Sequence, residues 1–252
     1  MPDFLRYGLL CLLVLITYFQ EAVTGFGCTV LALPFAILLL GSIAEAKPVL
    51  VMLALVLNCG VSLLARKHIR WKEVWIILIL VAVGLPGGML MADYLPEKWL
   101  KVILAGFMVA IGIQGLFTLG NGVSTKASRR TRILASGFLP IGGIIHGAFA
   151  SGGPLVVIYA TRAITDKSVF RVTLATAFVV INTAMVATWK IQHIITLHHV
   201  YLAAICLPFT LAGLFIGDHV HYRLPALAFK RMVYAVLTVA GVALGWVALA
   251  AK

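Results

Sequence analysis

Ten apolar segments, five on each side of one polar linker, dominate this sequence. Most of them approach the roughly 20 residues that a transmembrane helix needs. Leu, Ile, Val and Phe fill the segments without alternating with polar residues, whereas the strands of a membrane β-barrel alternate apolar and polar positions. The continuous runs therefore predict an all-α polytopic membrane protein.

The composition agrees with this class. Hydrophobic residues make up 62% of the 252 residues and charged residues only 11%, and the mean hydropathy is +1.08, far from the balance of a soluble domain. The formal net charge is +12, but the basic residues lie in short gaps between apolar runs, where they set membrane orientation. We therefore expect a lipid bilayer as the surroundings and no nucleic-acid partner.

Cysteine and histidine positions give no sign of a metal site. The four cysteines all lie within apolar runs and lack the spacing of metal ligands or of a disulfide framework: Cys11, Cys28, Cys59 and Cys206. His198-His199 and the pair His219 and His221 fall in expected loops. We predict neither a metal nor another cofactor.

Two glycine-rich breaks interrupt the apolar sequence, and an ionisable residue precedes each. The first reads Glu21-Ala-Val-Thr-Gly-Phe-Gly-Cys28, and the second reads His146-Gly-Ala-Phe-Ala-Ser-Gly-Gly-Pro154. Irregular backbone at membrane depth is tolerated only where it lines a protein-buried or water-filled cavity. The two breaks are therefore the candidate site.

The apolar run after each break is too short to span a bilayer. These runs, Cys28 to Leu40 and Leu155 to Ile164, are predicted to be half-helices. Ser151 is well placed to cap the second one, and Pro154 suits its first turn because proline lacks an N–H. Uncovered N–H groups and the helix dipole attract anions, so we expect the two helix N-termini to form an anion-binding cradle.

The predicted substrate-binding residues come from the breaks and from two asparagines at matching places in long apolar helices: Thr24, Gly25, Gly27, Cys28, Asn58, His146, Ser151, Gly152, Gly153 and Asn182. His146 is expected to hydrogen-bond or charge-pair with a small anionic substrate, because histidine changes charge near physiological pH. Glu21 and His146 are the candidates for proton coupling. A side chain at Gly152 is expected to block transport without disturbing folding. The alternative role for the asparagines is interhelical hydrogen bonding.

Landmark residues recur in the same order on both sides of the linker, at offsets of 122 to 129 residues. The pairs are Gly27 and Gly152, Asn58 and Asn182, Pro86 and Pro208, Gly88 and Gly213, Asp93 and Asp218, and Leu95-Pro96 and Leu224-Pro225. This pattern indicates a duplicated unit, with repeat 1 over residues 1–119, a linker over 120–132 and repeat 2 over 133–252. Because each unit has an odd number of segments, the two repeats are predicted to be inverted relative to each other.

Basic residues divide unequally when successive gaps are placed on opposite sides of the membrane. One side collects Arg66, Lys67, Arg70, Lys72, Lys126, Arg129, Arg130, Arg132, Arg162, Lys167, Arg171, Arg223, Lys230 and Arg231. The other collects Arg6, Lys47, Lys98, Lys101, Lys190 and Lys252. The positive-inside rule then predicts a cytoplasmic linker and two periplasmic termini.

Two further glycine motifs, Gly84-x-x-x-Gly88 and Gly213-x-x-x-Gly217, lie within long apolar runs. Small residues at this spacing let transmembrane helices approach closely. We expect both motifs to serve helix packing rather than substrate binding.

The chain resembles the TauE/SafE family of sulfite exporters, also described as toluene-sulfonate uptake permeases. The resemblance rests on the Gly25-Phe-Gly27 and Ser151-Gly-Gly-Pro154 breaks, the Pro-x-x-x-x-Gly-like stretches near Pro86 and Pro208, and the two-unit layout. Cys28 stands where family members often carry another glycine. The resemblance implies a bacterial inner-membrane transporter of small sulfur-containing anions, such as sulfite, sulfonates or sulfoacetate.

Two alternatives are an anion channel and a membrane enzyme acting on a lipid or quinone. A channel predicts a polar stripe along the whole length of a helix, whereas the polar residues here cluster around the breaks. An enzyme needs convergent catalytic groups, but the eight carboxylates lie mostly at segment ends. A secondary carrier is the favoured interpretation.

Overall fold

The computed structural model describes residues 3–118 and 129–221 and parts of 234–249, and no β-strand occurs among them. This described part contains seven spans long and apolar enough to cross a membrane. They are formed by α1 (Asp3–Thr24), α3 (Ile43–Leu64), α4 (Trp71–Tyr94), α5 (Glu97–Thr118), α6 with α7 (Arg129–Ser136 and Phe138–Phe149), α9 (Lys167–Ile191) and α10 (Leu197–His221). The prediction of an all-α polytopic membrane protein is confirmed.

Each glycine break is followed by a short helix, as expected. These helices are α2 (Cys28–Leu40, 13 residues) and α8 (Gly153–Ala163, 11 residues). At 1.5 Å per residue they extend only about 20 and 17 Å, well short of the roughly 30 Å hydrocarbon core of a bilayer. A 3₁₀ helix, η1 (Arg66–His68), connects α3 to α4.

The helices before the breaks are longer than the sequence indicated. α1 continues past Glu21 to Thr24, and α7 continues past His146 to Phe149. Glu21 and His146 thus belong to the last turn of a helix. Their backbone carbonyl groups accept 2.6 Å hydrogen bonds from the backbone N–H groups of Gly25 and Ala150, respectively. The breaks themselves begin one turn later.

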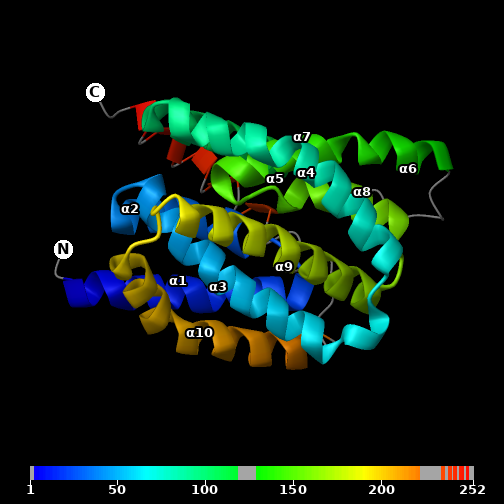
Figure 1. The fold of residues 1–252 in the computed structure, drawn as a ribbon, viewed down its shortest axis with the longest axis horizontal. Coiled ribbons are helices and arrows are strands. Elements are labelled where there is room, and N and C mark those ends of the chain that lie inside the picture. Colours follow the sequence, from blue (N-terminus) through cyan, green and yellow to red (C-terminus); the bar gives the residue numbers. More distant parts are fainter. Residues whose placement is uncertain are drawn as a thin grey trace.

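Two closely packed helix pairs flank the middle of the molecule (Figure 1): α7 lies along α4, and α1 lies along α10. The helices of each pair can come this close because glycine residues lie at their contacts. A Cβ atom on Gly88 would lie 2.0 Å from the Ile144 carbonyl oxygen, and one on Gly217 would lie 2.5 Å from Ala22 Cβ. The packing role predicted for both glycine motifs is confirmed.

The helix contacts are reciprocal between the two predicted units. The sequence offset makes α6 with α7 the counterpart of α1, and it matches α8 to α2, α9 to α3 and α10 to α4. Accordingly, α1 packs on α10 while α7 packs on α4, and α3 and α9 pack on each other. Residues 120–128 of the predicted linker lie outside the described residues, whereas its last four residues, Arg129–Arg132, already form the start of α6. The tenth predicted segment, 227–249, is described only in part.

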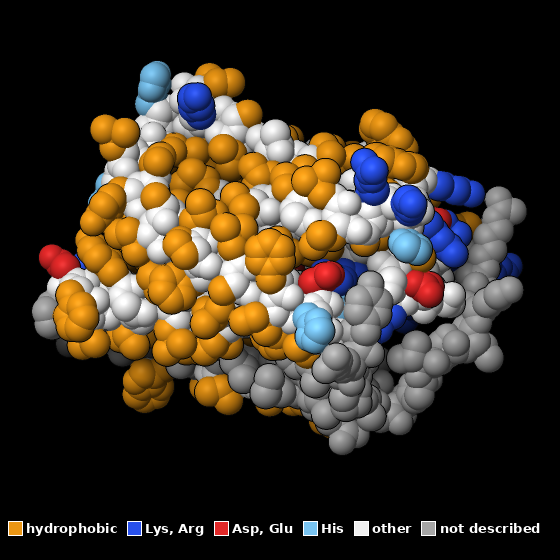
Figure 2. Space-filling model, turned by 90° about the horizontal axis from the view of Figure 1, so that it is seen from below, with side chains coloured by type: hydrophobic (Ala, Val, Ile, Leu, Met, Phe, Trp, Pro, Cys, Tyr) orange, Lys and Arg blue, Asp and Glu red, His pale blue; other side chains and the backbone are white. Residues whose placement is uncertain are grey.

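Hydrophobic side chains cover most of the face that carries α10, and Lys and Arg side chains gather toward one end of it (Figure 2). Large exposed apolar residues occur on several helices, among them Leu12, Val83 and Phe215. Such a surface is typical of contact with lipid rather than water.

Candidate anion-binding site

The two breaks meet inside the helix bundle. Gly25 and Gly27 adopt left-handed conformations with φ of +88° and +103°, which glycine tolerates best, and they lead into α2. A Cβ atom on Gly153, the first residue of α8, would lie 3.7 Å from Phe26 Cβ and 3.9 Å from the Gly27 nitrogen. The N-termini of α2 and α8 are therefore neighbours.

A small cavity lies where the breaks meet. It is lined by seven of the residues predicted from the sequence: Glu21, Gly27, Asn58, His146, Ser151, Gly153 and Asn182. Its free space accommodates about one water-sized group. An anion with four or more heavy atoms therefore needs the walls to move apart.

Glu21 occupies the N-terminus of α2. Its Oε2 accepts a 2.7 Å hydrogen bond from the Cys28 backbone N–H, and its Oε1 accepts a 2.9 Å hydrogen bond from Asn58 Nδ2. A carboxylate is a favourable partner for the positive end of a helix dipole, so Glu21 fills the position expected for a bound anion. The Cys28 thiol is buried and lies 3.5 Å from Thr29 Oγ1.

His146 forms the corresponding pair in the second half of the chain. Its Nε2 lies 3.0 Å from Asn182 Oδ1, and its ring stacks on Phe178 with a centroid distance of 5.5 Å. Because an amide oxygen only accepts, Nε2 carries the proton in this arrangement. Among the described residues, His146 Nδ1 has no hydrogen-bond partner.

Ser151 does not cap α8, so this part of the prediction is wrong. Its hydroxyl donates instead to the Phe149 carbonyl (2.9 Å), and the N-cap position belongs to Gly152 without a side-chain hydrogen bond. The left-handed turn at Ala150 directs the hydroxyl back to α7, where it satisfies a carbonyl that lacks a helical partner. Pro154 occupies the first turn of α8 as expected, and the N-terminus of α8 keeps no side-chain cap in the described structure.

Four predicted residues lie outside the cavity lining: Thr24, Gly25, Cys28 and Gly152. The Thr24 hydroxyl lies 3.0 Å from the carbonyl oxygens of Gln20 and Phe26, and Gly25 packs on the backbone of Arg171. A Cβ atom on Gly152 would lie only 2.1 Å from the Gly142 carbonyl oxygen. The expectation that a side chain there leaves folding undisturbed is therefore wrong, because α7 and α8 touch at this point.

Five further residues line the cavity: Thr29, Val30, Ala54, Ala150 and Phe178. Ala150 lies within the second break recognised in the sequence, and Thr29 directly follows the first. Ala54 and Phe178 each precede a predicted asparagine, Asn58 and Asn182, by four residues. Helical periodicity places such residues on one face, and this signal could have found them.

Basic side chains cap the C-terminal ends of the helices that precede the breaks. Lys47 Nζ donates to the Ala148 carbonyl (3.1 Å) at the end of α7 and lies 5.0 Å from the centre of the Trp189 ring. At the end of α1, His221 Nδ1 donates to the Val23 carbonyl (2.6 Å). Positive charge is favourable at a helix C-terminus, so these contacts stabilise the ends of both helices.

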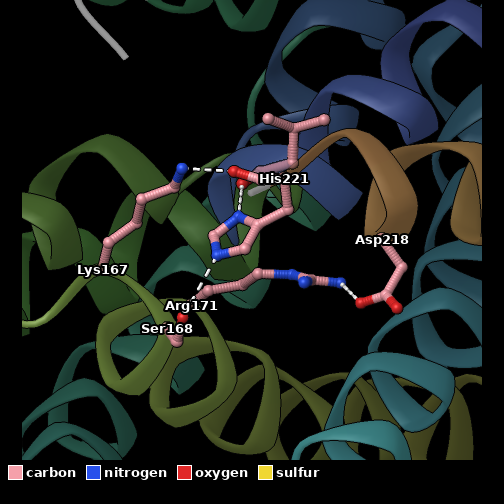
Figure 3. A network of polar contacts seen from close by, with 6 residues as sticks. Lys167, Ser168, Arg171, Asp218 and His221 are labelled. Carbon is pink, nitrogen blue, oxygen red and sulfur yellow. Dashed lines mark hydrogen bonds and ion pairs between the residues drawn. The ribbon is translucent and has the colours of Figure 1, made fainter. Parts of the chain in front are cut away.

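A wider polar network surrounds the end of α1 (Figure 3). Lys167 donates to the His221 carbonyl, Ser168 lies 3.5 Å from His221 Nε2, and Arg171 forms a 2.8 Å ion pair with Asp218. Arg171 is buried, although the sequence had placed it among basic residues of a loop. Lys47 was also placed in a loop. Lys47 and Arg171 are 124 positions apart, as Asn58 and Asn182 are, and this shared offset could have indicated that both basic residues lie in helices.

Comparisons with known proteins agree with this architecture. The family model "Sulfite exporter TauE/SafE" matches residues 10–244. The probable inner membrane transporter protein TsaS of Comamonas testosteroni is 23% identical over 179 residues, which cover 71% of this chain and 73% of that relative. No solved structure matches the chain. The chain is thus a multi-pass membrane transporter rather than an enzyme, and it belongs to the TauE/SafE sulfite exporter family.

Proposed function

We propose that this transporter is a secondary carrier of small sulfur-containing anions, such as sulfite or organosulfonates, and that it binds the anion beside the N-terminus of α8. The observation that carries the proposal is the cavity at the meeting point of the two breaks, which is lined by residues of both units. Secondary transporters commonly place their substrate between two repeats, at the ends of discontinuous helices.

The N-terminus of α8 is the better of the two helix ends for a substrate anion. It has no side-chain cap among the described residues, whereas Glu21 already accepts the Cys28 N–H at the start of α2. Helix N-termini bind anions through free N–H groups and the helix dipole. Of the two helix N-termini in the proposed site, only that of α8 is therefore available to the substrate anion.

His146 supplies the second attraction for the anion. Asn182 holds Nε2, so Nδ1 is the ring atom without a described partner. In the imidazolium form Nδ1 donates a hydrogen bond, and a hydrogen bond between charged groups is among the stronger ones. His146 is thereby also the candidate for coupling anion binding to a proton.

The reciprocal packing supports a carrier with two inverted units. If each helix is replaced by its counterpart in the other unit, the α1–α10 contact becomes the α4–α7 contact. Each unit also contributes one break, one half-helix and one asparagine to the centre. Two related halves around one site can expose it to either side by moving relative to each other. The small free space in the cavity favours such movement over a permanently open channel.

A flux assay with the purified protein in liposomes tests the proposal, run with sulfite, organosulfonates and carboxylates. A carrier gives saturable counterflow that is faster for the sulfur anions. An ohmic current would indicate a channel, and an absence of flux for every sulfur anion would overturn the proposed substrate class.

A further inference from the structure

We propose that the cavity wall contributed by the first unit binds a Na⁺ ion, through the Glu21 carboxylate, the side-chain carbonyl of Asn58 and the Thr29 hydroxyl. All three residues are buried and line the cavity. The inference rests on the proposed anion carrier function, since it names the cation that shares the cavity with the anion. Hard cations of this kind prefer oxygen ligands.

The hydrogen bonds of Asn58 determine which of its atoms is available. Asn58 Nδ2 donates to Glu21 Oε1 (2.9 Å) and to the Ala54 carbonyl (2.8 Å). Both partners are acceptors, so the amide nitrogen must face them. The amide oxygen, Oδ1, is left without a hydrogen-bond partner among the described residues, although Asn58 is only 1% exposed. A buried oxygen of this kind needs a donor or a cation.

Glu21 provides the negative charge. Its two oxygens accept hydrogen bonds from Cys28 and Asn58, and each oxygen keeps a further lone pair that can bind a cation. The side chain is 4% exposed. A buried charge inside a membrane protein is costly unless it is compensated, and the cost increases when a substrate anion enters the same cavity.

The cavity wall formed by the second unit favours an anion rather than a cation. There the Asn182 oxygen is already paired with His146 Nε2, and the positive end of the α8 dipole carries no side-chain cap among the described residues. The two walls therefore differ in kind although they come from matching positions of the two units. An anion on the wall formed by the second unit and a cation on the wall formed by the first attract each other across the cavity, and each strengthens the binding of the other.

Size and ligand charge favour Na⁺ over other cations. The free space accommodates about one water-sized group, which suits a small dehydrated ion. Ca²⁺ takes six to eight oxygen ligands that usually include several carboxylates, and among the described residues Glu21 is the only carboxylate in the lining.

The direct test is thermal unfolding of the purified transporter without substrate, in sodium gluconate and in N-methyl-D-glucamine gluconate at equal ionic strength. A ligand that binds only the folded state raises the melting temperature. We expect Na⁺ to raise it by about 2 °C or more. Sulfite binding, measured separately, should tighten at least about fivefold in Na⁺, the lower end of typical coupling between two sites.

Variants at Thr29 and Asn58 separate ion binding from folding. Thr29→Val removes an oxygen at constant shape and should abolish the Na⁺-dependent shift, while Thr29→Ser should retain it. Asn58→Ala should lose the shift as well, but it also removes a partner of Glu21, so Thr29→Val is the cleaner variant. The matched control is Asn182→Ala, which should weaken sulfite binding and still show the Na⁺-dependent shift.

Equal melting temperatures in the two salts, or a Na⁺ shift that survives in Thr29→Val, would overturn the proposal and leave a water molecule as the partner of Asn58. A response to pH in place of Na⁺ would equally overturn it in favour of a proton. Failure of the anion proposal looks different: the wild-type protein would then be stabilised by Na⁺ but would bind no sulfite.

Discussion

The Glu21 carboxylate accepts a 2.7 Å hydrogen bond from the backbone N–H of Cys28, the first residue of α2. An acidic side chain of the chain itself thus occupies one of the two half-helix N-termini that meet in the cavity. His146 follows Glu21 by 125 positions, and it cannot fill the end of α8 in the same way because it is not an anion. On the proposed function, this difference leaves one helix end for the substrate.

The first prediction concerns His146. His146→Gln should lower the affinity for sulfite about tenfold or more, because it removes a hydrogen bond to a charged group, and should also flatten the dependence of that affinity on pH between 5.5 and 8. The measurement is sulfite binding to purified protein across this range. The control is His198→Gln, since His198 is exposed on α10. An unaltered affinity and pH profile in His146→Gln would assign this histidine a structural role.

A pair of neighbouring glycines tests the anion site at α8. A Cβ atom on Gly153 would have no neighbour closer than 3.7 Å, whereas one on Gly152 would lie 2.1 Å from the Gly142 carbonyl oxygen. Gly153→Ala should therefore fold normally and bind sulfite several-fold more weakly, because the methyl group occupies space at the helix end. Gly152→Ala should lower the yield of folded protein in size-exclusion chromatography. Wild-type sulfite affinity in Gly153→Ala would exclude this helix end as the site.

Helix packing can be tested with another adjacent pair. A Cβ atom on Gly88 would lie 2.0 Å from the Ile144 carbonyl oxygen, while one on Gly87 would meet nothing within 4 Å. Gly88→Ala should destabilise the protein by about 1–3 kcal/mol, as is typical of overpacking, and Gly87→Ala should have little effect. Melting temperatures of the two variants decide the matter. Equal melting temperatures would contradict the close contact between α4 and α7.

The Arg171–Asp218 ion pair should contribute to stability. Arg171 is 3% exposed, so Asp218→Asn leaves its buried charge without a countercharge and should cost about 1–3 kcal/mol. Asp93, which lies 125 positions before Asp218, is exposed but acts electrostatically on the buried Lys47, so Asp93→Asn should cost less than Asp218→Asn, about 0.5–1 kcal/mol. The comparison is made by thermal unfolding. An unchanged melting temperature in Asp218→Asn would show that the ion pair adds no stability.

The topology proposal makes a prediction for reporter fusions. With a cytoplasmic linker and periplasmic termini, alkaline phosphatase should be active when fused after Lys252 and inactive when inserted into residues 120–128. Green fluorescent protein at the same positions should give the reverse pattern, because it fluoresces only when it folds in the cytoplasm. The opposite result in both assays would contradict the orientation predicted from the basic residues, whereas both sites on the same side of the membrane would contradict the inversion of the units.

Much of the architecture followed from local features of the sequence. The continuous apolar runs predicted the membrane helices, and the shortness of the runs after the breaks predicted α2 and α8. The glycine motifs that include Gly88 and Gly217 predicted close packing. These features depend on the periodicity and size of side chains within one helix, which a sequence displays directly.

The bonding within the site depended on the tertiary structure. The sequence placed Glu21, Asn58, His146 and Asn182 among the candidates, but their pairing and the unpaired Asn58 Oδ1 became visible only in three dimensions. It also assigned Ser151 a capping role that the turn at Ala150 prevents. Lys47 and Arg171 were counted as loop charges, yet both are buried in α3 and α9.

The physical reason lies in the range of the interactions. Helix formation and the need to bury apolar surface act over neighbouring residues, so the apolar pattern alone determined a helical membrane protein with two broken helices. A hydrogen bond or an ion pair between side chains depends on distance and direction in space, and Lys47 meets Ala148 across 101 positions of the chain. Only the folded arrangement decided that Glu21 fills one helix end and that the other carries no side-chain cap.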